Sequence, residues 1–206
     1  MHAFVGESLH VHAFNVRRRR VPTQRRGINM AKTSEFVLSE RLEVTTSGTA
    51  VNGTIDLGAY IDVGDSQGVM IKQVDFIWQG VTSAGAAQAM ALAVTANGVG
   101  QCQVFDLNRG GTEQFADDNA LVASGQIHFG FDENTVSNDA DIYPDRFGRP
   151  GGRVVINDNL YVTTNWTGAI ASNEKISCTV LVTCVITKLS KKDFMALAIS
   201  SSASSE

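Results

Sequence analysis

Cysteine, proline and histidine are all scarce in this chain of 206 residues. The three cysteines lack the spacing of metal ligands, which argues against a zinc ribbon and against a secreted disulfide scaffold. Cys178 and Cys184 fall on one expected strand, where a rise of about 3.3 Å per residue holds them too far apart for a disulfide. We therefore expect Cys102, Cys178 and Cys184 to be buried as small apolar residues.

Catalytic motifs are absent as well. His128 is the only histidine after residue 12, and it belongs to no nucleophile elbow, phosphate-binding loop or zinc-protease motif. A metal-binding enzyme of the cupin type needs a histidine cluster, which one strand histidine does not provide. The sequence therefore predicts a protein that is not an enzyme, with His128 at a surface or an interface.

Long apolar runs are missing too. No stretch reaches the roughly 18 consecutive apolar residues of a membrane span. The first 20 residues place their positive charges after the apolar part, which is the reverse of the order in a signal peptide. We expect neither a membrane span nor a secretion signal.

Charge is unevenly distributed along the chain, whose formal net charge is −4. Residues 1–30 hold six arginines and one glutamate, a net charge of +5, which leaves −9 for residues 31–206. A part of the chain with that charge repels nucleic acid over most of its surface. Contact with nucleic-acid phosphates is therefore expected from the arginines of the N-terminal arm, which are Arg17, Arg18, Arg19, Arg20, Arg25 and Arg26.

A second interpretation of the arm stays open. Residues 30–33, Met-Ala-Lys-Thr, have the form of an ordinary N-terminus, and the preceding Arg-Arg-Gly-Ile-Asn can be encoded by a prokaryotic ribosome-binding sequence read in frame. In that case translation starts at Met30 rather than Met1, and the arm is an upstream non-native extension. CGN codons at Arg25 and Arg26 would exclude this interpretation.

Alternation of apolar and polar residues dominates the chain from residue 35 onward and predicts half-buried antiparallel strands. Short helices are expected at 112–122 and 190–199, a turn at 95–100, and a long loop at 132–152. The eight expected strands lie around residues 36–44, 55–63, 74–78, 90–94, 102–104, 127–131, 154–166 and 176–186.

Eight strands in one domain predict an all-β fold, an eight-stranded antiparallel jelly-roll sandwich with a basic N-terminal extension. A jelly roll is favoured over an immunoglobulin-like sandwich because the strands and some of the loops are long. The expected divisions are an arm or extension at 1–34, a jelly-roll domain at 35–189, and a C-terminal tail with a short helix at 190–206.

Strand count, basic extension, absent catalytic motifs and polar tail together resemble the single jelly-roll capsid proteins of small icosahedral viruses. The tract GRPGGRVVINDNLYVTTNW, residues 148–166, is similar to the loop and penultimate strand of such proteins. The resemblance covers residues 35–188 as an architecture. It implies a structural coat protein that assembles with many copies of itself in the host cell and encloses the viral genome in an icosahedral virion.

The loop at 132–152 is the place where we expect subunit contacts. Its carboxylates predict either a solvated acidic loop or a calcium site between subunits, with Asp139, Asp141 and Asp145 as ligands. Arginines beside them, among them Arg153, predict salt bridges between neighbouring subunits. The further interface candidates are Tyr143, Arg146, Phe147, Arg149 and, in the C-terminal tail, Phe194 and Met195.

A carbohydrate-binding β-sandwich module is the alternative function. It needs aromatic side chains that form an exposed stacking platform, and the candidates are Tyr60, Trp78, Tyr143, Tyr161 and Trp166. This alternative is weakened because Trp78 and Trp166 both fall on strand faces that the alternation assigns to the core.

Overall fold

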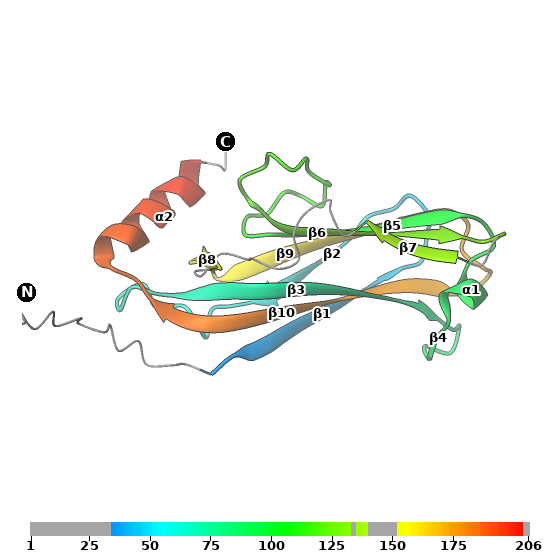
Figure 1. Ribbon diagram of the computed structural model, residues 1–206, viewed down its shortest axis with the longest axis horizontal. Coiled ribbons are helices and arrows are strands. Elements are labelled where there is room, and N and C mark those ends of the chain that lie inside the picture. Colours follow the sequence, from blue (N-terminus) through cyan, green and yellow to red (C-terminus); the bar gives the residue numbers. More distant parts are fainter. Residues whose placement is uncertain (1–33, 133–134, 140–151, 204–206) are drawn as a thin grey trace, which may run out of the picture. The chain divides into compact units, whose positions relative to one another are not determined.

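The computed structural model describes residues 34–132, 135–139 and 152–203, with the backbone alone at 138–139 and 201–203. The described residues belong to one compact unit, residues 33–206, and form ten strands and two helices (Figure 1). The elements are β1 (Phe36–Val44), β2 (Val51–Asp56), β3 (Gln67–Val81), β4 (Ala87–Gln88), α1 (Met90–Ala93), β5 (Gly98–Phe105), β6 (Leu121–Gly130), β7 (Thr135–Asp139), β8 (Arg153–Val155), β9 (Asn159–Thr167), β10 (Lys175–Lys188) and α2 (Lys191–Ala203).

The strands form two antiparallel sheets. Sheet A has the order β1-β10-β3, and the far edge of β3 pairs with β8 at residues 69–71 and with β4 at residues 80–81. Sheet B has the order β2-β9-β5-β6-β7. The protein is therefore mostly β with two antiparallel sheets, in agreement with the all-β sandwich that the alternation predicts. The domain boundaries stay predictions.

The hydrophobic core combines inward-facing side chains of both sheets. One cluster contains Leu42 of β1 and Val180 of β10 together with Val104 of β5 and Leu160 of β9. The three cysteines are buried and unpaired, as predicted. Burial raises the pKa of the Cys178 thiol well above its usual range, with a contribution from Cys102, which belongs to the opposite sheet.

The predicted strands at the two ends of the domain are confirmed, whereas two other runs are wrong in whole or in part. The runs at 36–44 and 176–186 are confirmed as β1 and β10. The run at 90–94 is wrong, because Met90–Ala93 forms α1, and a four-residue stretch rich in alanine and leucine suits a helix. The run at 55–63 is right only at its start, because Asp56 accepts a hydrogen bond from the Gly58 amide at 2.7 Å and the chain turns there.

The two helix predictions have opposite outcomes. Residues 112–122 form turns followed by the start of β6, so the predicted helix there is wrong. The helix at 190–199 is confirmed as α2. The hydroxyl of Ser190 accepts a hydrogen bond from the Asp193 amide at 3.1 Å and donates one to the Asp193 carboxylate at 2.6 Å, which caps the first turn of the helix. Neither described helix is long and apolar enough to cross a membrane.

Two glycines open strand β5 where the sequence predicts a turn. Gly98 and Gly100 are buried and share the inward face of β5 with Cys102. A Cβ atom at Gly100 would lie 2.7 Å from the Trp78 ring, and one at Gly98 would overlap the Trp166 ring. Glycine within a strand often marks such a close approach. The glycines therefore make room for two tryptophans whose ring centroids lie 6.5 Å apart.

Candidate functional site

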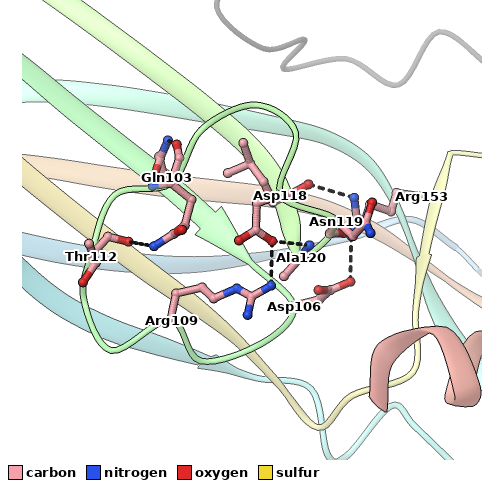
Figure 2. Close-up of polar contacts among 10 residues, drawn as sticks. Gln103, Asp106, Arg109, Thr112, Asp118, Asn119, Ala120 and Arg153 are labelled. Atoms are coloured by element: carbon pink, nitrogen blue, oxygen red, sulfur yellow. Dashed lines mark hydrogen bonds and ion pairs between the residues drawn. The ribbon is translucent and has the colours of Figure 1, made fainter. Parts of the chain in front are cut away.

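The candidate site is built on the β5–β6 loop, residues 106–120, whose path is fixed by side-chain contacts. Two ion pairs hold it (Figure 2). Arg109 Nη2 lies 2.7 Å from Asp118 Oδ1, and Arg153 Nη2 lies 2.8 Å from Asp106 Oδ2. The four side chains are between 13% and 23% exposed, so the pairs are only partly screened by solvent.

Arg153 is the central side chain of this brace. Its guanidinium also donates hydrogen bonds to the carbonyl oxygens of Leu121 at 2.8 Å and Asn119 at 2.6 Å. Arg153 belongs to β8 in sheet A, whereas its partners belong to sheet B and the loop. The predicted salt bridge between Arg153 and a neighbouring subunit is wrong, because the carboxylate partner of Arg153 is Asp106 of the same chain.

Asp106 is held in an environment that disfavours its charge. Burial raises the pKa of this carboxyl, while the charge of Arg153 and its hydrogen bond act in the opposite direction. The backbone is fixed beside it, because Asn157 donates a side-chain hydrogen bond to the Asp106 carbonyl at 2.7 Å. Arg153 therefore favours the ionised form of Asp106 against the effect of burial.

A second fastening joins the loop to the sheet beneath it. Gln103 of β5 donates to the Gln114 carbonyl and accepts from the Gln114 amide, both at 2.8 Å. Asp118 accepts a further hydrogen bond from the Ala120 amide at 2.7 Å. The loop has no helix to stiffen it, yet these contacts fix its path. They present Phe115, which is 87% exposed, to solvent.

Beside the loop lies a hollow of about 410 Å³ on the outer face of sheet B. Its floor consists of outward-facing residues of β5 and β6, and its wall is residues 113–116 of the loop. The floor residues are uncharged and polar: Gln101, Gln103, Ser124 and Gln126. Burial raises the pKa of Glu113 in the wall. His128 lines a separate hollow of about 600 Å³ farther along the same face.

Most of the site residues predicted from the sequence lie outside the described residues. These are Arg17, Arg18, Arg19, Arg20, Arg25 and Arg26 in the arm, and Asp141, Tyr143, Asp145, Arg146, Phe147 and Arg149 in the long loop. For Asp139 only the backbone is described, in β7. The part of the chain that is described contains no group of three or more potential metal ligands. The calcium and interface assignments stay predictions.

The two interface candidates of the C-terminal tail differ in exposure. Phe194 is 6% exposed and so is buried within the chain, whereas Met195 on the same helix is 60% exposed. Ile199, one turn further along, is 64% exposed. If α2 contacts a neighbour, Met195 and Ile199 are the side chains that reach it.

The tryptophan platform of the carbohydrate alternative does not form. Trp166 is fully buried, Trp78 packs against the core, and Tyr60 stacks on Phe36 with ring centroids 4.5 Å apart. The core-face assignment of both tryptophans is thus confirmed. Any carbohydrate site of the described residues must use other side chains.

Sequence reasoning missed Phe115 and the brace behind it. Arg153 and Asp106 are 47 positions apart, and no local pattern connects them. The available signal was the composition of residues 106–120, where four acidic residues and Arg109 place opposite charges close together in the sequence. That signal does not identify partners.

Comparison with known proteins adds little to these observations. No family model matches the chain, and no curated protein matches it. Among solved structures, the chain matches one titled Desmodium yellow mottle tymovirus, with 5% identity, 77% of this chain and 93% of that chain covered, and a TM-score of 0.26. A TM-score this far below 0.5 does not establish a shared fold, and nothing about this protein is concluded from it.

Proposed function

We propose that this protein is a viral coat protein that assembles into an icosahedral shell around its genome. The observation that supports this proposal is the strand order. When the short strands β4 and β7 are set aside, sheet A has the order β1-β10-β3-β8 and sheet B the order β2-β9-β5-β6. Most successive strands cross from one sheet to the other, which is how a jelly roll wraps its core. Viral capsid domains, lectin domains and cupins use this arrangement.

The histidine content and the arginine-rich arm of this chain distinguish among capsid domains, lectin domains and cupins. A cupin holds its metal with several histidines, and beyond residue 12 this chain has only His128. A lectin domain functions without a basic extension, whereas a coat protein uses one to neutralise its genome. Among the three classes, a coat protein is the one in which a translated arm with six arginines, preceding a part of the chain with net charge −9, has a use.

The exposed apolar side chains suit assembly through many weak contacts. Phe115 projects from a loop that is already ordered, so a neighbouring subunit that binds it does not have to immobilise the loop. Met195 and Ile199 provide a second contact on α2. Closed symmetry repeats each such contact over the whole shell, so that no single one has to be strong.

Assembly of the expressed full-length chain tests the proposal. We expect electron microscopy and size-exclusion chromatography to show large closed particles. Phe115→Asp should raise the protein concentration needed for assembly at least tenfold, because a buried aromatic anchor contributes about 2 kcal/mol or more per contact. Phe115→Leu should assemble with a smaller loss.

The control is Val63→Asp, which places the same charge at a side chain that is 68% exposed in a turn of the chain. A wild-type chain that stays monomeric under all salt and calcium conditions overturns the proposed function. If Phe115→Asp forms particles as readily as the wild type, Phe115 makes no subunit contact, and the coat-protein proposal itself is unaffected.

Removal of the arm tests the proposed contact with the genome. Particles of a chain lacking residues 1–29 should contain less nucleic acid than full-length particles prepared at the same salt concentration. Loss of six arginine–phosphate contacts should flatten the dependence of log affinity on log salt concentration by about 4–5 units. Unchanged nucleic-acid content contradicts the proposed contact between the arm and the genome. An intact mass showing that the chain in native particles begins near Met30 contradicts it as well.

A further inference from the structure

The hollow beside the β5–β6 loop, whose lining includes Phe115, has the size of a ligand site. Its volume of about 410 Å³ lies within the range of about 300–1,000 Å³ typical of small-molecule sites. Its lining residues come from β5, from β6 and from the loop that Gln103 fastens over the sheet. The hollow is therefore formed by ordered elements on two sides.

The floor is a compact array of uncharged hydrogen-bonding groups. Gln101 lies directly opposite Gln126 across β5 and β6, and Gln103 lies opposite Ser124. Side chains of such facing pairs have Cβ atoms about 4.5–5.5 Å apart. On the other side, Asn165 of β9 lies opposite Gln101 and extends the same face. An array of this kind can offer donors and acceptors at close, regular spacing.

Several of these groups have no partner in the described part of the chain. The side-chain amides of Gln101 and Gln126 make no hydrogen bond to a described residue, in contrast to Gln103, which is engaged by Gln114. In the wall of the hollow, Glu113 Oε1 is a buried acceptor that also lacks a described partner. A buried acceptor without a donor costs about 1–3 kcal/mol, which a bound ligand with hydroxyl or amide donors would recover.

The lining also restricts which ligands fit. It contains the carboxyl of Glu113 and no lysine or arginine, which disfavours phosphate, sulfate and carboxylate groups. Amides outnumber apolar side chains, which disfavours a lipid or a purely apolar ligand. Phe115 in the loop wall and Leu121 of β6 are its larger apolar residues, and a ring with an apolar face can lie against the Phe115 side chain.

We propose that this hollow binds a neutral carbohydrate, with the amides of Gln101 and Gln126 and the carboxyl of Glu113 bonding its hydroxyl groups and Phe115 contacting the face of a sugar ring. Each sugar hydroxyl donates and accepts, which matches paired amide side chains better than any singly charged group does. The inference does not depend on the chain being a coat protein. Because Phe115 is also the proposed subunit contact, a sugar and a neighbouring subunit would compete for its ring.

The test uses the full-length protein and a panel of neutral disaccharides, namely lactose, cellobiose, chitobiose and mannobiose. Sialyllactose, a heparin disaccharide and a short oligonucleotide serve as anionic probes. We expect saturation-transfer difference NMR to detect at least one neutral sugar. Gln101→Leu and Gln126→Leu should each weaken its binding about tenfold, the effect of losing roughly 1.4 kcal/mol of hydrogen bonding.

The matched control is Gln79→Leu, the same change at an exposed position of β3 in sheet A, which should leave binding unchanged. Urea unfolding of each variant verifies that the fold is retained, and the wild-type measurement stands whatever the variants do. Absence of binding to every neutral sugar overturns the proposal. Binding of the anionic probes alone overturns it as well, and so does a wild-type affinity in both floor variants. Light scattering reports assembly separately, so failure of this inference is distinguishable from failure of the proposed function.

Discussion

Replacing Arg153 by methionine is expected to lower the free energy of unfolding by about 2–3 kcal/mol at pH 7. The change leaves Asp106 buried without its cation and removes the donor to the carbonyl oxygens of Leu121 and Asn119. Loss of one partner of a buried ion pair costs about 3–5 kcal/mol, and the partial exposure of this pair places the effect at or below the lower end. Urea unfolding followed by tryptophan fluorescence measures it.

The loss should depend on pH because of Asp106. Burial already raises the pKa of this carboxyl above its unfolded value, and without Arg153 the pKa rises further. The folded variant then binds a proton that the unfolded chain releases, so its stability falls as pH rises through the folded pKa. The destabilisation by Arg153→Met is therefore expected to be smaller at pH 4 than at pH 7.

The control for this prediction is Arg41→Met. Arg41 pairs with Glu43 at 2.9 Å on the outer face of β1, but its side chain is 57% exposed. An exposed pair of this kind contributes at most about 1 kcal/mol, and we expect a loss of about 0.5 kcal/mol or less. If both arginine variants lose the same small amount, the β5–β6 loop does not depend on Arg153.

Gly98→Ala is expected to destabilise the protein by about 2 kcal/mol, although alanine has the higher strand propensity. The new Cβ atom would overlap the ring of Trp166, which is fully buried, and would lie 2.6 Å from the Thr167 carbonyl oxygen. Inserting a methyl group into a packed core typically costs about 1–3 kcal/mol, and the reduced entropy of the unfolded chain offsets part of it. Chemical denaturation gives the value.

Two comparisons identify the cause. Gly64→Ala adds the same methyl group at a position where the nearest atom is the Asp62 carboxylate at 3.2 Å, and it should change stability by less than about 0.5 kcal/mol. In a Trp166→Phe background, which removes the ring edge nearest Gly98, the cost of Gly98→Ala should shrink. An additive double variant would show that the ring contact is not the source of the strain.

The fold class was predictable because its signal is local. A half-buried strand alternates its side chains between core and solvent, and the runs of β1 and β10 are long enough to display this period. Cysteine burial and the inward direction of Trp78 and Trp166 follow from the same alternation. Where a run covered only a few residues, as at Met90–Ala93, a period of two could not be distinguished from one turn of helix.

Most of the candidate site was not predictable in this way. Arg153 was predicted to form a salt bridge, but with a neighbouring subunit, since nothing local in the sequence indicates that β8 lies near the β5–β6 loop. The glycines at 98 and 100 were predicted to form a turn, because their role becomes visible only beside the tryptophan rings in the folded protein. Phe115 had no signal, since exposure is a property of the folded surface.

The sequence by itself determined the alternating strands, the buried face of each, and the separation of a basic arm from an acidic remainder. Tertiary structure alone decided the strand order in the two sheets, the partner of Arg153, the position of Phe115 and the amide array formed by Gln101 and Gln126. The physical reason is distance along the chain. Alternation acts between adjacent residues, whereas strand pairing, ion pairs and hollows join residues tens of positions apart, whose proximity depends on how the whole core packs.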